Sequence, residues 1–187
     1  MKYLITGLGN PGAAYENTRH NIGFKILDAL ADASNIVFSD KRYGCVAEYK
    51  FKARTLILLK PATYMNLSGQ AVNYWMKQED IALENLLIIN DDLALPMGTL
   101  RLKPKGGDAG HNGLKSIQDS LGTKNYARLR FGIGDNFRPG RQVDYVLSEW
   151  SREEKAMLPE RIDVCIRIIQ SFSTIGVELT MTEFNGK

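Results

Sequence analysis

The two histidines of the chain are the residues whose chemistry stands out first. Each is followed by asparagine, as His20-Asn21 and His111-Asn112, and each lies at the edge of a predicted loop. With an ordinary pKa of about 6.5, a histidine can accept a proton at neutral pH. We therefore predict that His20 is a general base that activates a water molecule. The pattern leaves open the alternative of a packed residue at the start of a helix.

Asp91 is the acid best placed to support such a base. It directly follows residues 86–90, a short apolar run typical of a strand buried on both faces. The carboxyl ends of such strands commonly carry ligand sites in α/β proteins. A carboxylate there can hold a histidine in one tautomer and stabilise its protonated form. An aspartate that merely forms the turn after the strand is an equally valid interpretation.

Asparagines in the same loops offer neutral N–H groups that suit an oxyanion, although asparagine beside glycine also favours turns.

The sequence gives little support for other reaction chemistries. The scattered histidines and acids lack metal-ligand spacing, so no metal is expected. The chain has no G-x-S-x-G motif, and Cys45 has no histidine close in sequence. Direct attack by water, with no cofactor, is the simplest mechanism that these residues predict.

Alternating strand and helix patterns must bring these residues together. They predict one α/β domain over residues 1–187, with a mixed, mostly parallel β-sheet flanked by helices. Strands are expected at residues 2–8, 42–50, 54–60, 86–90, 99–103 and 128–134, and helices from Ile22, over 68–77 with a Ser68 cap, over 114–121, and from a Ser151 capping box to about Thr174. The histidines and asparagines fall in or beside the connecting loops.

The segment from Gly7 to Gly12 fits the G-x-G-x-x-G pattern of a dinucleotide-binding turn. Such a turn opens directly into a helix and is followed about 20 residues later by a ribose-binding acid. Here the helical period begins only near Ile22, Asp32 falls inside that helix, and Asp40 comes late. A dinucleotide-dependent enzyme is therefore kept only as an alternative.

Composition indicates an ordinary globular protein with one basic region. The apolar runs are shorter than the roughly 20 residues of a membrane span, the N-terminus does not read as a signal peptide, and the two cysteines lie far apart. A cytoplasmic protein is expected. Between Arg101 and Arg141, nine lysines and arginines stand against three aspartates, within a chain whose net charge is only +3. A solvated surface is the alternative to a binding site for an anionic partner.

Taken together, the motifs resemble those of bacterial peptidyl-tRNA hydrolases. They occur in that family's order from residue 5 to about 150, and several ordered motifs are more specific than any one of them. The matching segments are Gly7-Leu-Gly-Asn-Pro-Gly12, Thr18-Arg-His-Asn-Ile-Gly23, Lys60-Pro-Ala-Thr-Tyr-Met-Asn-Leu-Ser-Gly69, Asp91-Asp-Leu93 with Leu95-Pro96, Gly110-His-Asn-Gly-Leu114 and Leu129-Arg-Phe-Gly-Ile-Gly134.

The resemblance implies hydrolysis of the ester between a peptide and the terminal ribose of tRNA, by a monomer without metal or cofactor. His20 would be the base, Asp91 its orienting partner, and Asn10 would help distinguish peptidyl-tRNA from free aminoacyl-tRNA. Contacts with the substrate are implied for Tyr15, Tyr64, Met65, Asn66, His111 and Asn112. Lys103, Lys105 and Arg130 would hold tRNA phosphates without reading sequence.

Two departures from the family pattern affect the expected RNA side of the site. Ala94 stands where the family usually has an acid, and Asp108 adds a negative charge to the glycine-rich segment. Neither removes an expected catalytic group, but both could reshape substrate contacts. They motivate a second alternative, an RNA-binding relative that has lost catalysis.

Overall fold

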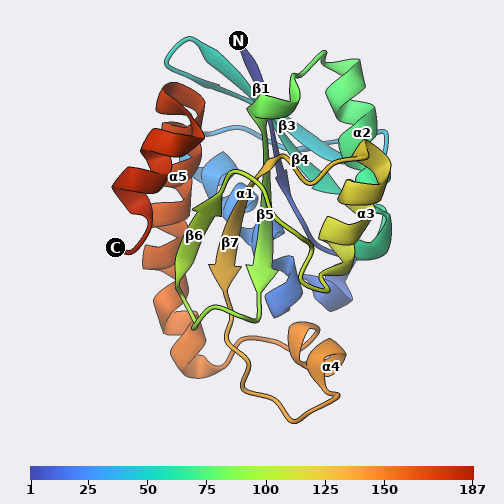
Figure 1. Cartoon of the computed structure of the whole chain (residues 1–187), viewed down its shortest axis with the longest axis vertical. Coiled ribbons are helices and arrows are strands. Elements are labelled where there is room, and N and C mark those ends of the chain that lie inside the picture. The colour runs from blue at the N-terminus through green and yellow to red at the C-terminus, as the bar shows by residue number, and fades with distance from the viewer.

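The computed structural model describes all residues, 1–187, as one seven-stranded mixed sheet between helices (Figure 1). The strand order is β2-β3-β4-β1-β5-β7-β6. The strands are β1 (Lys2–Gly7), β2 (Ser39–Lys41), β3 (Gly44–Phe51), β4 (Arg54–Pro61), β5 (Leu86–Asp92), β6 (Leu100–Lys103) and β7 (Ala127–Gly132). The predicted α/β class and mixed sheet are confirmed.

The central strands β4, β1, β5 and β7 run parallel, so their carboxyl ends meet at one edge of the sheet. Strands β2, β3 and β6 pair antiparallel with their neighbours. Every residue of β5 is buried, as its continuous apolar run predicted.

Helices cover both faces of the sheet. The helices are α1 (Ile22–Ala33), α2 (Ser68–Gln78), α3 (Asn112–Leu121), α4 (Gln142–Val146) and α5 (Arg152–Phe184). Apolar residues of α1 and α5 pack on one face in a cluster of 25 buried residues, and those of α2 and α3 pack on the other in a cluster of 14. The short helix α4 lies beyond the carboxyl ends of β5 and β7 (Figure 1).

Most predicted elements are present, with three differences. Strand β2 and helix α4 were missed, because neither buries a residue and so neither leaves an apolar period. The predicted Ser68 cap is wrong, because the Ser68 hydroxyl donates to the carbonyl of Met65 at 2.7 Å instead of accepting from the helix. The Ser151 capping box is confirmed, and Gly176 interrupts α5 with a φ of 85°, just beyond the predicted end at Thr174.

Helix α5 has the length and composition of a membrane-crossing helix, with an 18-residue window of mean hydropathy 1.2. Its apolar residues, among them Ile162, Ile169 and Phe172, belong to the core on the α1 side of the sheet. The interruption at Gly176 also divides it into two segments. These contacts account for its apolar character as that of a core helix.

Two glycines let β1 and α1 pack backbone against backbone. A Cβ on Gly7 would lie 2.2 Å from the carbonyl oxygen of Gly23, and one on Gly23 would lie 2.4 Å from the amide nitrogen of Leu8. Gly9 has a similar role, since its Cβ would lie 2.8 Å from the Phe24 ring. Gly7 and Gly9, two glycines of the dinucleotide-like pattern, therefore allow close packing between strand and helix. This packing holds the loop between β1 and α1 in place.

Candidate active site

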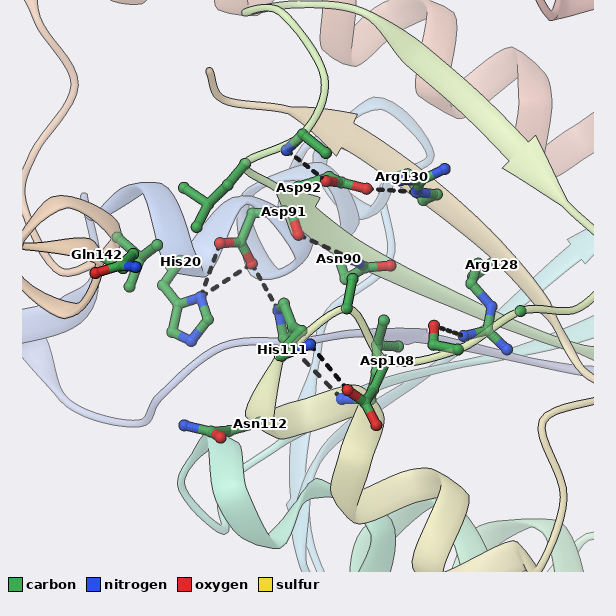
Figure 2. A pocket seen from close by; sticks show the side chains of 18 of the residues that line it. His20, Asn90, Asp91, Asp92, Asp108, His111, Asn112, Arg128, Arg130 and Gln142 are labelled. Atoms are coloured by element: carbon green, nitrogen blue, oxygen red, sulfur yellow. Dashed lines mark hydrogen bonds and ion pairs between the residues drawn. The ribbon is translucent and has the colours of Figure 1, made fainter. Parts of the chain in front are cut away.

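A cavity of about 590 Å³ opens at the carboxyl end of β5 and along the face of β7 that carries Arg128 and Arg130. The ends of β5 and β6, the glycine-rich loop 104–111, the start of α3 and helix α4 form its walls, with His20 at one side. Figure 2 shows both histidines pointing toward Asp91 at the end of β5. The structure thus gathers the two histidines and the acid that the sequence singled out.

His20 is held directly by Asp91. Its Nδ1 lies 2.8 Å from Oδ2 and 3.0 Å from Oδ1 of the carboxylate, and its side chain is 11% exposed. Donation from Nδ1–H to the carboxylate leaves Nε2 as the unprotonated nitrogen of the neutral ring. This is the arrangement that a general base requires.

Burial and charge act in opposite directions on this pair. Burial by itself would lower the pKa of His20, but the charge of Asp91 and its hydrogen bond outweigh burial and raise that pKa above its ordinary value. Burial would raise the pKa of Asp91, but the charges of His20 and His111 and their hydrogen bonds hold that pKa well below its usual range. Asp91 is therefore an ionised, fully buried carboxylate that stabilises a proton on His20.

His111 reaches the same carboxylate from the start of α3. Its Nε2 lies 2.9 Å from Asp91 Oδ1, and its Nδ1 accepts hydrogen bonds from the backbone N–H groups of Gly113 and Leu114. The two histidine rings are 4.9 Å apart between centroids. The sequence brought His111 forward as a substrate contact and gave no sign of its bond to Asp91.

The same three side chains have the donor types of a metal site, with their ligand atoms within 4.8 Å of one another. Their nitrogens, however, are already at hydrogen-bond distance from the carboxylate oxygens. These direct contacts leave no space for an ion between the donors, and Nε2 of His111 must carry a proton because Nδ1 accepts. The geometry fits a hydrogen-bonded cluster better than a metal site.

Asn10 is fixed by a second set of hydrogen bonds next to His20. Its backbone exchanges two bonds of 2.9 Å with the side chain of Asn21, and its Oδ1 accepts from the Met65 amide at 2.7 Å. The Nδ2 group of Asn10 is thereby left to donate elsewhere. The sequence did not identify Asn21 as the residue that orients Asn10.

The remaining expected substrate contacts lie around this core. Tyr15 and Tyr64 pack edge to face at 6.4 Å, and Tyr64 has a positive φ of 57°, a costly conformation for a tyrosine. The amides of Asn66 and Asn112 are exposed and have no hydrogen-bond partner within the protein. Asn112 lines the cavity, whereas Asn66 lies outside its lining on the turn before α2.

The floor of the cavity is a polar face of the sheet. In β7, Leu129 and Phe131 point into the core on the α5 side, so strand alternation turns Arg128 and Arg130 to the other face. Arg130 is paired with Asp92, and Arg128, only 2% exposed, donates to the carbonyls of Gly107 and Lys124. Of the expected phosphate contacts, Lys103 and Lys105 therefore carry charges with no acidic partner, while the charge of Arg130 is partly neutralised.

The two departures from the family pattern lie in this part of the cavity. Ala94 lines it, and its amide donates to Asp92 at 2.8 Å. Asp108 accepts from the Gly110 amide at 2.8 Å and thus shapes the glycine-rich loop. Asp108 therefore has a structural contact in the loop, and its charge faces the same cavity as Lys103 and Lys105.

Arg19 anchors the segment that carries His20. It is 8% exposed, forms an ion pair of 2.7 Å with Glu154, donates to the carbonyl of Tyr145 at 3.2 Å, and stacks 4.1 Å above the Tyr145 ring. The backbone of Arg19 also donates to Ser148 at 3.1 Å. These contacts tie the residue before His20 to α4 and to the start of α5.

Known proteins resemble this chain over its whole length. The peptidyl-tRNA hydrolase family profile matches residues 4–187. The chain is 62% identical to a peptidyl-tRNA hydrolase of Phocaeicola vulgatus and 59% identical to one of Bacteroides fragilis, each over 187 residues and the full length of both chains. It resembles the crystal structure of peptidyl-tRNA hydrolase from Acinetobacter baumannii with a TM-score of 0.92 at 36% identity, over 98% of this chain and 94% of that one. The chain belongs to the peptidyl-tRNA hydrolase family.

Proposed function

We propose that the cavity cleaves the ester between a peptide and the terminal ribose of tRNA by direct attack of water. His20 removes a proton from the water through Nε2, and Asp91 holds the ring and stabilises the imidazolium that forms. The proton can then be passed to the leaving ribose oxygen, which yields free tRNA and a peptide acid. The observation that carries this proposal is the His20–Asp91 pair with Nε2 free to act.

The asparagines fit complementary roles. The exposed amides of Asn66 and Asn112 can donate to the negative oxygen that develops on the ester carbon. Asn10, whose Nδ2 is free while Oδ1 is held by Met65, can donate to the carbonyl of the blocked amino group of the substrate. Tyr15, Tyr64 and His111 border this region, where a flat ring can stack on the terminal base or pack on the peptide.

The role of Asn10 has a direct test. Asn10→Asp preserves the oxygen that accepts from Met65 but replaces the free N–H donor with a negative charge. We expect the ratio of hydrolysis rates for N-acetyl-aminoacyl-tRNA and free aminoacyl-tRNA to fall about tenfold, the equivalent of roughly 1.4 kcal/mol. Asn17→Asp, an exposed change of the same charge in the same loop, is the matched control. An unchanged ratio in Asn10→Asp would remove Asn10 from substrate discrimination.

The basic side of the cavity is proposed to hold tRNA phosphates. Each phosphate contact contributes about one unit to the slope of log affinity against log salt. Lys103→Ala and Lys105→Ala should each reduce the slope for tRNA binding by about that amount. Arg130→Ala should reduce it less, since Asp92 already offsets its charge. Lys50→Ala, a largely exposed change on β3, serves as control; a slope equal to wild type in all three cavity variants would contradict this footprint.

The partner and location follow from the same reaction. We expect the protein to act as a monomer in the cytoplasm, where translation produces peptidyl-tRNA, with no requirement for a metal or cofactor. The alternative of an RNA-binding relative without catalysis, raised by Ala94 and Asp108, has less support, because His20, Asp91 and Asn10 are all present and hydrogen-bonded. RNA binding without ester cleavage by the wild-type protein would favour that alternative.

A further inference from the structure

We propose that His111 is a positioning residue that fixes the Asp91 carboxylate and, through it, the orientation of His20. This inference rests on the proposed roles of His20 and Asp91 and assigns to His111 a task separate from contact with substrate. The His111 ring forms hydrogen bonds through both of its nitrogens, and Figure 2 shows the one to Asp91.

Backbone groups at the start of α3 set the tautomer of His111. Its Nδ1 accepts from the backbone N–H groups of Gly113 at 3.1 Å and Leu114 at 3.4 Å, so this nitrogen carries no proton. A neutral ring then has its proton on Nε2. That nitrogen lies 2.9 Å from Asp91 Oδ1, so His111 donates to Asp91. The backbone of α3 thus sets which nitrogen faces the carboxylate.

Helix α3 also sets the position of the His111 ring. His111 is the N-cap residue of α3, with extended φ and ψ of −75° and 117°. Gly113 provides the space for the ring, because a Cβ there would lie 3.0 Å from His111 Cε1 and 2.7 Å from Met65 Sδ. The His111 side chain is only 10% exposed. A ring held by a helix cap and by close packing is a rigid donor.

The rigid His111 ring in turn holds the Asp91 carboxylate. The carboxylate is 2% exposed and receives hydrogen bonds from two donors, Nδ1 of His20 and Nε2 of His111. Without His111, His20 would be the sole side-chain donor to a buried charge. The carboxylate could then rotate with His20, and its undivided charge would act on His20 alone.

Other charged groups around the cluster already have partners or lie across the cavity. Asp92 is paired with Arg130, and Arg19 with Glu154. The side chains of Lys103, Lys105, Asp108 and Arg128 line the cavity but form no hydrogen bond with the side chains of His20, Asp91 or His111, although the backbone N–H of His111 donates to the Asp108 carbonyl at 2.9 Å. The coupling of His20 to Asp91 therefore depends on His111 more than on any other neighbour.

The tautomers can be tested without substrate. In ¹⁵N-resolved spectra of the imidazole nitrogens of the free protein, we expect His111 to be protonated at Nε2 and His20 at Nδ1 at a pH where both rings are neutral. These assignments do not depend on activity, so they separate this inference from the proposed reaction. A proton on Nδ1 of His111 would overturn the inference even if His20 proves essential.

The kinetic test is His111→Asn, since asparagine is itself a favourable N-cap and preserves the start of α3 but is too short to replace the ring at Asp91. We expect a melting temperature near that of wild type, a roughly tenfold lower kcat, and an acidic limb of the kcat–pH profile displaced upward by about one unit. Lys50→Ala, a largely exposed change on β3 outside the cavity, provides the comparison and should leave kcat and the pH profile unchanged. A higher KM with unchanged kcat and pH profile would show that His111 acts only as a substrate contact and would overturn the inference.

Discussion

Replacing His20 by alanine is expected to lower kcat for N-acetyl-aminoacyl-tRNA about 10³-fold, within the range of roughly 10²–10⁴ that general acid–base catalysis supplies. The KM should change little, because the proposed tRNA and peptide contacts lie on other residues. The measurement is steady-state hydrolysis at saturating substrate across pH. The acidic limb of the wild-type profile should disappear from the residual activity, because the group that produces it is gone.

His20→Asn is the matched variant for this test. Asparagine can donate a hydrogen bond to Asp91, so the buried carboxylate has a replacement donor, but it cannot accept a proton at neutral pH. A similar loss in both variants, with melting temperatures near wild type, would assign the loss to the missing base. Near-normal turnover by either folded variant would rule out His20 as the base.

Asp91→Asn is expected to lower kcat about 10²-fold or more. An amide in place of the carboxylate can present its N–H₂ group to His20 Nδ1, which favours the wrong tautomer and places the proton on Nε2. The charge that stabilises the imidazolium is also lost. Steady-state kinetics on the same substrate measures this effect, and unchanged activity would remove Asp91 from the mechanism.

The pH profile gives Asp91→Asn a second, directional signature. In the wild type, the Asp91 charge outweighs burial and raises the pKa of His20 above about 6.5, so activity should rise with pH through a value above that. In Asp91→Asn, burial remains and the charge does not, so the pKa of His20 should fall. The acidic limb should therefore move to lower pH while the maximum rate drops. A limb that stays in place would show that the rate reports a different group.

Stability should depend on pH in a related way. Because folding raises the pKa of His20, proton binding to His20 stabilises the folded state. This stabilisation is complete below the pKa of His20 in the unfolded chain and is lost as pH rises through the pKa of His20 in the folded protein. Because folding lowers the pKa of Asp91, the ionised carboxylate stabilises the folded state at any pH above the pKa of Asp91 in the unfolded chain. This stabilisation is fully lost only in strong acid. The excess stability of wild type over Asp91→Asn should thus be largest between about pH 4 and pH 6.5.

The pairing of His20 with Asp91 could be predicted because its chemistry is encoded in residue types. His20 and Asp91 are 71 positions apart, yet one is the base that suits neutral pH and the other follows a strand that had to be central. The parallel strands β1 and β5 then bring the two segments to one edge of the sheet. Strong local patterns, such as the Ser151 capping box, were likewise readable.

The supporting contacts could not be predicted, because they depend on distant backbone positions. Arg19 is of a type usually found at the surface, and its partners Tyr145 and Glu154 are 126 and 135 positions away. The bond from His111 to Asp91 requires the exact start of α3 and the space left by Gly113, neither of which periodicity determines. Asn21 was noted only as the residue that follows His20, although its side chain holds both backbone polar groups of Asn10.

The tie between Arg19 and Glu154 has a consequence for the synthesis of the protein itself. A chain grows from its N-terminus, so His20 is made long before Asp91, His111 and Glu154. Throughout translation the growing chain is joined to a tRNA by the same kind of ester that the mature protein cleaves. Its histidine acquires the buried carboxylate and the anchored neighbouring arginine only after most of the chain has been made. The enzyme thus becomes competent only near the end of its own translation, when few residues remain to be added to the tRNA-linked chain.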